Sequence, residues 1–371
     1  MKMRLKVRAK PLAAVGLGAL FLASFFIPFI LASREGDRAI GAQTHGFESI
    51  EAAAEWSFLN QGPVIPVYRT RSHMVENVPL EAYVRGVLAA EMPAEFEMEA
   101  LKAQAIAART FIVKRIGERN KGTLPVQGLG PQANEAEKKA ADSAGEQAAV
   151  EAWVNDTIEH QVYLSVEEMK QRWRGGEFSQ YLTKLTRAVK ETEGKVITYG
   201  GQPIQASFFS TSNGFTENSE EYWSNAFPYL RSVASPWDSE VSPKFSAVTI
   251  FTVDEFTEKL GLGASAKASF IKSGVKVEAY STGKQIAKLK IGGQTFTGRE
   301  LREKLELPSA TFTIRRSGQE VRIETKGYGH GVGLSQYGAN GMALEGKTAE
   351  EIISYYYKGV TVENAAAYLP K

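Results

Sequence analysis

Glu91 is the residue of this sequence best placed for acid–base chemistry. Apolar residues recur at helical spacing from Leu80 to Leu88, and Glu91 continues their stripe, so its carboxyl faces the core side of a helix. Pro93 disfavours helix at the residue before it, which puts Glu91 in the last turn. Partial burial and the negative end of the helix dipole both raise the pKa of a carboxyl, as a general acid near neutral pH requires. The alternative is a glutamate that reaches solvent where the helix frays.

A second candidate is the glycine-rich stretch 327–341, which reads GYGHGVGLSQYGANG. Its glycines allow positive φ or a close approach of the backbone to a ligand. Polar side chains on such a loop suit hydrogen bonding to a polyhydroxyl ligand, and an aromatic face suits stacking on a sugar. The side chains concerned are His330, Ser335, Gln336 and Tyr337. A tight structural turn with a hydrogen-bonded histidine is the alternative interpretation.

Other kinds of site are not expected. Residues 341–348 satisfy the Walker A pattern, but no buried strand precedes them and the letters MALE favour a helix. Gly346 then caps that helix, and Thr348 with Glu351 forms the capping box of the next one, so no nucleotide is expected. The four histidines are not at ligand spacing and HExxH is absent, so we expect no metal and no cofactor. Cysteine is absent, which excludes disulfides and thiol catalysis, and no GxSxG elbow marks a serine hydrolase.

The first 33 residues predict a membrane anchor. All five charges before position 11 are positive, and residues 11–32 are uncharged and long enough to cross a bilayer as a helix. We expect a short cytoplasmic tail (1–10), a transmembrane signal anchor (11–33) and an extracytoplasmic remainder, which makes a single-pass membrane protein. The chain has 44 Lys and Arg against 42 Asp and Glu, so without the leader it carries a small acidic excess. A nucleic-acid partner is therefore not expected.

The rest of the 371 residues predicts an α+β fold with two parts. Strands and long helices indicate a catalytic core, and short alternating strands with two amphipathic helices indicate a smaller mixed subdomain, with a cleft between the two. A polar, Ala/Glu/Lys-rich insertion interrupts the core. The expected boundaries are a stalk at 34–62, the core at 63–247 with its insertion at 120–150, the subdomain at 248–325, and a return to the core at 326–371.

Several segments resemble the stage II sporulation protein D (SpoIID) family over about residues 63–362. They are VPLEAYVRGVLAAEMP (78–93), LKAQAIAARTF (101–111), DTIEHQVY (156–163), TEGKVITYGGQPIQA (192–206), SFFSTSNGFTENSEEYW (207–223) and the stretch from 327 to 360. The resemblance implies a peptidoglycan lytic transglycosylase. Such an enzyme cleaves between N-acetylmuramic acid and N-acetylglucosamine in glycan strands stripped of stem peptides, and it leaves 1,6-anhydro ends.

The resemblance also implies site residues. The catalytic acid of the family falls on Glu91. Substrate-binding positions carry over to Lys102, Arg109, Gln161, Tyr163, Ser210, His330, Gln336 and Tyr337. From spacing alone, Lys102 and Arg109 are better explained as an exposed helix face. Some relatives hold zinc with cysteines and histidines around His160, but those cysteines are missing here, so His160 is expected to be an ordinary polar residue.

A single carboxylate suffices for the implied reaction, because the muramic acid supplies its own C6 hydroxyl as the nucleophile. The resemblance further implies stimulation of the amidase SpoIIP and assembly with the membrane protein SpoIIM during engulfment, in the septal space of a sporulating cell. Two other functions remain open on the residues. The domain could be a non-catalytic glycan-binding amidase enhancer, or a membrane-anchored scaffold whose surface, not its cleft, matters.

Overall fold

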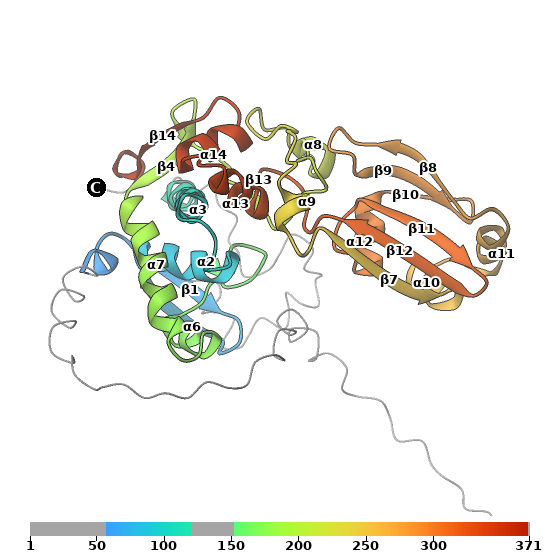
Figure 1. Ribbon diagram of the computed structural model, residues 1–371, viewed down its shortest axis with the longest axis horizontal. Helices are drawn as coiled ribbons and strands as arrows, with labels where there is room; N and C mark the ends of the chain where they lie inside the picture. Colours follow the sequence, from blue (N-terminus) through green and yellow to red (C-terminus); the bar gives the residue numbers. More distant parts are fainter. Residues whose placement is uncertain (1–56, 121–151, 370–371) are drawn as a thin grey trace, which may run out of the picture. The chain divides into compact units, whose positions relative to one another are not determined.

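The computed structural model describes residues 57–120 and 152–369 (Figure 1). The expected tail, anchor and most of the stalk lie outside the described residues, as does the insertion apart from Asn120. Within the part that is described, no helix has the length and apolar character needed to cross a membrane. The described end of the stalk is a 3₁₀ helix, η1 (Ser57–Asn60), whose Phe58 and Leu59 are buried in the main core, so the packed domain begins before residue 63.

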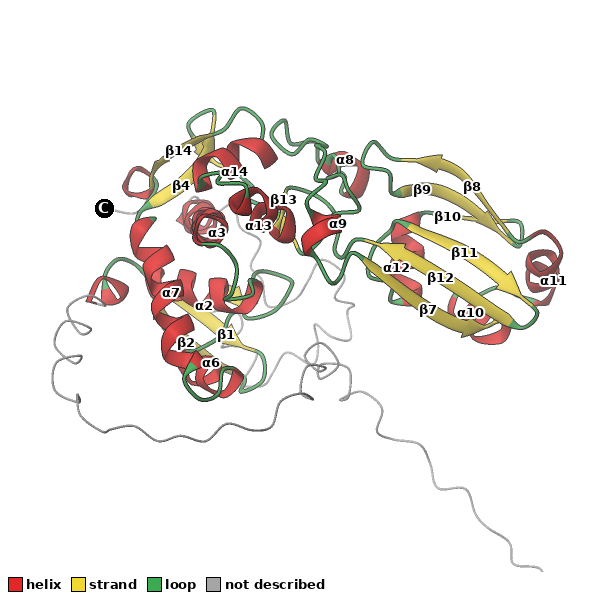
Figure 2. Cartoon of the chain, in the orientation of Figure 1, coloured by secondary structure: helices red, strands yellow, loops and turns green. Residues whose placement is uncertain are grey.

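The first part of the core is a hairpin that leads into two helices. Strands β1 (Val64–Arg69) and β2 (Met74–Pro79) pair antiparallel, and β3 (Val154–Asn155) adds to β1 in parallel. Helix α2 (Leu80–Glu91) follows β2 directly, and α3 (Met98–Asn120) follows after a short turn. Helices α6 (Val166–Arg172) and α7 (Glu177–Glu191) complete this part (Figure 2).

Helix α3 lies at the centre of the core. Its alanines and aliphatic residues are buried on nearly every side, which is typical of a helix surrounded by protein. It contacts α2, α7, β4 (Lys195–Tyr199), α13 (Gln336–Leu344) and α14 (Ala349–Tyr356). Small residues allow so many neighbours to approach closely.

The second part of the core joins segments far apart in the chain. Strand β4 pairs with β5 (Gln202–Pro203) on one side and β14 (Thr361–Asn364) on the other. The two-residue strands β6 (Phe208–Phe209) and β13 (Leu334–Ser335) pair in parallel. Two short helices, α8 (Ser219–Tyr222) and α9 (Asp238–Val241), and the final 3₁₀ helix η2 (Ala365–Ala367) complete it.

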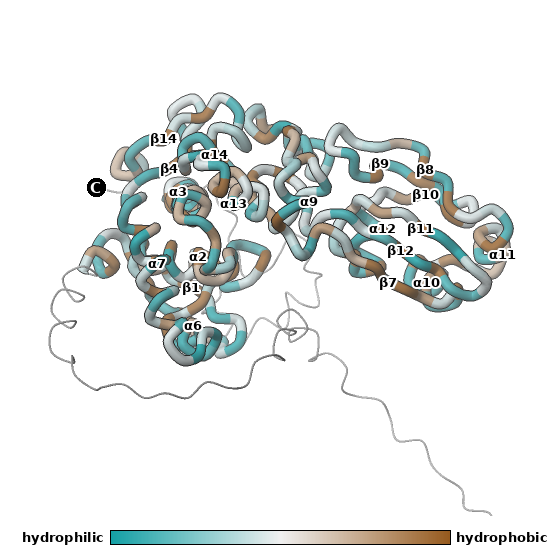
Figure 3. Tube along the Cα trace, in the orientation of Figure 1, coloured by the Kyte–Doolittle hydropathy of each residue, from teal (hydrophilic) through white to brown (hydrophobic). Residues whose placement is uncertain are grey.

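The smaller subdomain has its own hydrophobic core, formed among others by Phe256, Phe270, Leu289 and Leu301. Apolar and polar residues both occur along its strands (Figure 3), and on β12 the buried positions alternate, as expected for a sheet with one covered face. One sheet has the order β11-β12-β7 and the other β10-β9-β8. The elements are β7 (Ser246–Thr252), α10 (Val253–Lys259), α11 (Ala264–Ser273), β8 (Val275–Tyr280), β9 (Ile286–Ile291), β10 (Gln294–Phe296), α12 (Gly298–Leu305), β11 (Phe312–Ser317) and β12 (Glu320–Lys326).

The mixed α+β character predicted from the sequence is therefore present in the described residues. Loops of the core are hydrogen-bonded to the β8–β9 turn of the subdomain: Asn213 Nδ2 donates to the Gly283 carbonyl at 2.9 Å, and Glu217 Oε1 accepts from Gly283 N at 2.9 Å. The cleft between core and subdomain stays a prediction.

Candidate active site

Glu91 is the last residue of α2, as the sequence predicted. Met92, the C-terminal cap, is extended (φ −114°, ψ 141°), and its N–H still donates to the Leu88 carbonyl at 3.1 Å. Pro93 follows and prevents another turn. The helix therefore ends where its buried face presents a partly buried carboxyl.

The Glu91 carboxyl has a polar neighbour but no cation. Its Oε1 accepts a hydrogen bond from Val162 N at 3.0 Å, and among the described residues no Lys, Arg or His lies within ion-pair distance of it. Burial raises the pKa of Glu91 to about 7, against the opposing effects of the Val162 N–H and the Gln336 amide. A carboxyl with this pKa holds its proton in half of the molecules at neutral pH, which suits a general acid.

The segment 161–164 positions the Val162 N–H along α2. Leu164 N donates to the Gly86 carbonyl at 3.2 Å, and the Tyr163 ring occupies the space that a side chain at position 86 would need, since a Cβ on Gly86 would lie 2.2 Å from that ring. The Tyr163 ring also stacks on Tyr83, with centroids 5.7 Å apart. Tyr83 Oη in turn donates to Gln161 Oε1 at 3.1 Å.

Gln161 and Tyr163 were predicted to bind substrate, but the structure buries both. Their exposed fractions are 2% and 6%, and the Tyr163 hydroxyl donates to Glu76 at 3.2 Å. The missing side chain at Gly86 explains the burial of Tyr163, because the Tyr163 ring packs into the space that it leaves on the surface of α2. In this conformation both residues help to position Val162 for Glu91. Gln161 Nε2 is buried without a hydrogen-bond partner among the described residues, so contact of these two residues with substrate stays a prediction.

The glycine-rich stretch reaches Glu91 through the β6–β13 pairing. Leu334 pairs with Phe208 and Ser335 with Phe209, and Tyr337 N then donates to the Ser210 carbonyl at 3.0 Å. Gln336 and Tyr337 thus begin α13 beside the loop that follows Glu91. The Tyr337 ring makes an edge contact with Phe96 of that loop, with centroids 4.8 Å apart.

Among these side chains, Gln336 is the one with the most direct relation to the Glu91 carboxyl. Its exposed fraction is 5%, its amide is close enough to influence the Glu91 carboxyl, and its Nε2 has no hydrogen-bond partner among the described residues. A buried donor without a partner costs stability, and a role in the site is one explanation for it. The structure therefore brings Gln336 to Glu91, and it joins Tyr337 to Ser210 through a backbone hydrogen bond, residues that the sequence could group only through the family resemblance.

Asp238 fixes the start of α13, and no sequence pattern pointed to it. Its carboxyl accepts from Ser335 Oγ at 2.5 Å, Ser212 N at 2.8 Å and Ser235 Oγ at 2.6 Å. The glycine at 338 is needed here, because a Cβ would lie 2.4 Å from Ser235 Oγ and 2.7 Å from the Asp238 carboxyl. Part of the glycine-rich pattern is therefore explained by close packing of α13.

His330 lies in an aromatic cluster at the far end of the same stretch. Its ring contacts Phe209, Tyr222 and Trp223, with centroids 5.2–5.7 Å apart. Val332 N donates to His330 Nδ1 at 3.0 Å, so that nitrogen is the acceptor. Burial, and then the charge of Arg302, lower the pKa of His330 to about 3. The ring is neutral at physiological pH and cannot act as an acid. Contact between His330 and substrate stays a prediction.

Arg109 does not form part of this site. It is completely buried, and its guanidinium pairs with the Glu81 carboxylate at 2.9 Å (Nε to Oε1) and 2.6 Å (Nη2 to Oε2). Its Nη1 donates to the Lys195 carbonyl at 3.2 Å. Because the side chain has no exposed surface in this conformation, the contact with substrate stays a prediction that this geometry does not support. Neither an exposed face nor a ligand-binding role describes it; it joins α2, α3 and β4.

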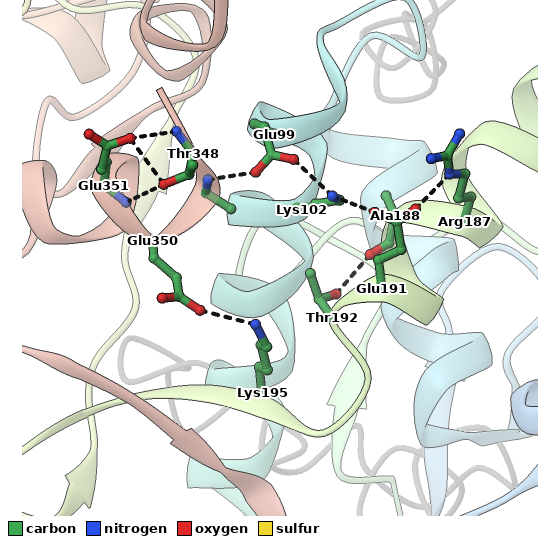
Figure 4. A network of polar contacts seen from close by, with 11 residues as sticks. Glu99, Lys102, Arg187, Ala188, Glu191, Thr192, Lys195, Thr348, Glu350 and Glu351 are labelled. Carbon is green, nitrogen blue, oxygen red and sulfur yellow. Dashed lines mark hydrogen bonds and ion pairs between the residues drawn. The ribbon is translucent and has the colours of Figure 1, made fainter. Parts of the chain in front are cut away.

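Lys102 is also engaged elsewhere (Figure 4). Its ammonium pairs with Glu99 at 2.8 Å and with Glu191 of α7, and Glu99 in turn accepts from Ala349 N at 2.8 Å. This network links α3, α7 and the start of α14, where the Thr348–Glu351 capping box predicted from the sequence is confirmed. Lys102 has no contact with Glu91, and its predicted role in substrate binding is not supported by this geometry.

His160 lies outside the Glu91 site. It accepts from Asn155 N at 3.1 Å, and burial, followed by the charge of Arg115, lowers its pKa to about 4. A pocket of about 210 Å³ between α3 and this loop is lined by Phe111, Lys114, Arg115, Glu118, Glu159, His160 and Gln205. Among residues 57–120 and 152–369, no group of three or more His, Cys, Asp or Glu is arranged to hold a metal ion.

Comparison with known proteins gives the chain relatives over most of its length. Residues 68–199 match the SpoIID family model, described as stage II sporulation protein. The chain is 44% identical over 367 residues to stage II sporulation protein D of Bacillus subtilis, covering 96% of this chain and 97% of the relative. It is 47% identical over 314 residues to the protein of the same name from Bacillus amyloliquefaciens, covering 84% and 83%.

A more distant relative has a different name. The chain is 27% identical over 328 residues to the amidase enhancer of Bacillus subtilis, which covers 75% of this chain and 40% of that protein.

Proposed function

Because the chain belongs to the stage II sporulation protein D family, we propose that it is a peptidoglycan lytic transglycosylase. Its substrate is the glycan strand from which stem peptides have been removed. It cleaves the bond between N-acetylmuramic acid and N-acetylglucosamine, and it leaves a 1,6-anhydro end during the engulfment stage of sporulation. The observation that carries this proposal is the Glu91 carboxyl, which is partly buried, has no cation at ion-pair distance among residues 57–120 and 152–369, and has its pKa raised to about 7.

One carboxyl can perform both proton transfers of this reaction. Protonated Glu91 gives its proton to the glycosidic oxygen as the C1–O bond breaks. The C6 hydroxyl of the same muramic acid attacks C1, so the nucleophile is tethered to the reacting centre. Glu91, now a carboxylate, takes the hydroxyl proton, which restores the enzyme and balances the step. A hydrolase of the common kind would need a second carboxyl to attack or to activate water.

The neighbours of Glu91 suit this cycle. The Val162 N–H donates to the Glu91 carboxyl at 3.0 Å and so fixes its position. A cation at the same place would lower the pKa of Glu91 much more and would remove its proton. The Gln336 amide lowers the pKa of Glu91, and its Nε2 makes no hydrogen bond within the described residues, so one of its two N–H groups is left for a sugar hydroxyl or acetamido oxygen. Tyr337, at the start of the same helix, offers an aromatic face for a sugar.

The proposed cellular role follows the family. We place the domain outside the cytoplasmic membrane, held by the N-terminal segment 11–33, and we propose that it stimulates the amidase SpoIIP and assembles with SpoIIM. A relative named amidase enhancer supports a connection to a cell-wall amidase. These partners and this location are proposals that co-purification and protease accessibility can test.

A second candidate function is a non-catalytic glycan-binding amidase enhancer. The name of the more distant relative favours it. In that case Glu91 would line the binding site without transferring a proton.

Mass spectrometry of purified peptide-free glycan strands separates the two functions. The strands are incubated with the wild-type chain or with Glu91→Gln, and no amidase is present. We expect anhydromuramyl ends from the wild type only, with glycan binding kept in the variant. Absence of products from both, with binding kept, would favour the enhancer. Equal products from both would remove Glu91 from the mechanism.

A further inference from the structure

Two basic side chains beside the Glu91 site have no acidic partner. Lys244 and Arg302 make no ion pair among the described residues, and Arg302 Nε is in addition buried without a hydrogen-bond partner. On α12 the glutamates are engaged elsewhere: Glu303 pairs with Arg299 at 2.8 Å, and Glu300 accepts from Thr297 N at 2.6 Å in a capping box. Arg302, between them in sequence, is left with an uncompensated charge.

Lys244 lies close to the Ser210 side of the site. Its ammonium is over the Tyr328 ring, 5.2 Å from the centroid. Tyr328 in turn is hydrogen-bonded through its backbone to Thr211, with Tyr328 N to the Thr211 carbonyl at 2.7 Å, and Thr211 follows Ser210 directly. The Ser242 hydroxyl, two residues before Lys244, bonds to the Thr211 hydroxyl at 2.7 Å.

A second cation lies near Lys244 on the Glu91 side. Arg172 Nη1 donates to the carbonyl of Ala89, two residues before Glu91, at 2.8 Å. Burial lowers the pKa of Lys244, and the charge of Arg172 lowers it further, so the two cations are close enough to repel each other. The charge of Glu95 acts on Arg172, whereas no acidic side chain pairs with Lys244 among the described residues.

Arg302 lies on the other side, next to the aromatic cluster. Its Nη1 donates to the Tyr222 hydroxyl at 2.7 Å, and its Nε is buried without a hydrogen-bond partner. The Tyr222 ring contacts the His330 ring at 5.7 Å. The His330 ring also contacts Phe209, which pairs with Ser335 beside Gln336. Lys244 is thus connected to the Ser210–Thr211 segment through Tyr328, and Arg302 is connected to Ser335 through Tyr222, His330 and Phe209.

We propose that Lys244 and Arg302 bind the free lactyl carboxylates of the glycan strand next to the cleavage site. The inference rests on the proposed function for the identity of the glycan. In peptidoglycan that still carries stem peptides, the lactyl carboxyl of each muramic acid is an amide and has no charge. Once the peptide is removed, each disaccharide carries one carboxylate. Lys244 and Arg302 thus distinguish stripped from unstripped strands by a charge on the lactyl group itself, and they act as specificity residues.

Binding to matched glycans tests this proposal without requiring cleavage. The full chain carrying Glu91→Gln is titrated with peptide-free oligosaccharides, and with the same oligosaccharides after their carboxylates have been reduced to alcohols. We expect the carboxylate form to bind about three- to tenfold more tightly at low salt, and the difference to shrink as salt is added. Lys244→Gln and Arg302→Gln together should remove this preference and leave binding of the reduced form unchanged.

Lys304→Gln is the matched control, because Lys304 is exposed on α12, two residues from Arg302. It should keep the preference. The single variant Lys244→Gln is included in case the double variant does not fold. The Lys244 side chain makes no hydrogen bond in the described structure, so this variant should fold, and it should lose part of the preference for the carboxylate form.

The proposal would be overturned if the Glu91→Gln chain bound the two glycans equally, or if the Lys244 and Arg302 substitutions lowered the affinity for both glycans by the same factor. If the wild type releases no anhydro ends while the preference persists, the proposed reaction fails and the carboxylate site stands.

Discussion

The two ends of α2 each carry a partly or fully buried glutamate, and the two carboxyls differ in their hydrogen-bond partners and in their position along the helix dipole. Glu81, in the first turn, pairs with the buried guanidinium of Arg109 through two hydrogen-bonded nitrogens. Glu91, in the last turn, accepts a backbone N–H from Val162 and has no cation within ion-pair distance among the described residues. The helix dipole favours a negative charge at the first position and disfavours one at the second. One helix thus holds a structural carboxylate and a carboxyl suited to proton transfer.

The same substitution at the two ends should give different results for stability. Glu81→Gln leaves the buried Arg109 charge without its counter-ion, so we expect the free energy of unfolding to fall by about 3–5 kcal/mol. Glu91→Gln keeps the size of the side chain and the Val162 hydrogen bond, so it should cost nothing near pH 4.5, where the Glu91 carboxyl is protonated. Denaturant unfolding of the two variants measures both. Equal losses would mean that the two carboxyls have equivalent surroundings.

The pH dependence of unfolding sharpens the difference. Because the folded pKa of Glu91 is raised to about 7, its contribution to stability is fully present below the unfolded pKa and is lost as pH rises through about 7. Gln does not titrate. Glu91→Gln should therefore match the wild type near pH 4.5 and be more stable above pH 8, by up to about 3 kcal/mol. A stability difference independent of pH would contradict the raised pKa.

Gly86 links the middle of α2 to the Glu91 end. Gly86→Ala places a Cβ in the Tyr163 ring and should shift the segment 161–164, with a loss of about 1–3 kcal/mol in unfolding free energy. The rate of glycan cleavage should fall even under conditions where the variant is fully folded, because the Val162 N–H moves away from Glu91.

Gly117→Ala on α3 is the control, since no neighbouring atom lies within 4 Å of where its Cβ would be and the change favours helix by about 1 kcal/mol. If Gly86→Ala lowers neither the unfolding free energy nor the cleavage rate, as expected for Gly117→Ala, the position of the segment 161–164 does not depend on the missing side chain at Gly86.

Local sequence signals predicted the Glu91 end of this comparison. The apolar stripe and Pro93 placed the carboxyl at a helix end, and the Thr348–Glu351 capping box located the start of α14. Both signals act over a few residues, so they can be read from the chain directly.

The other end could not be predicted in this way. The Glu81–Arg109 pair joins residues 28 apart, and the Lys102 network joins three helices, so spacing alone left both cations as a helix face. The approach of Gln336 to Glu91 depends on a two-residue parallel pairing between β6 and β13. Such short non-local pairings have no periodic signature, and only the family resemblance connected these residues beforehand.

The pH dependence of glycan cleavage tests the central claim most directly. The rate of anhydromuramyl end formation from peptide-free strands at low substrate is measured from pH 4 to pH 9. A general acid with a pKa of about 7 must be protonated to act, so we expect the rate to fall above pH 7 and to approach a tenfold loss for each further pH unit. A rate that stays constant from pH 6 to pH 9, or that already falls around pH 4.5, would contradict the assignment of Glu91 as a general acid held protonated by its surroundings.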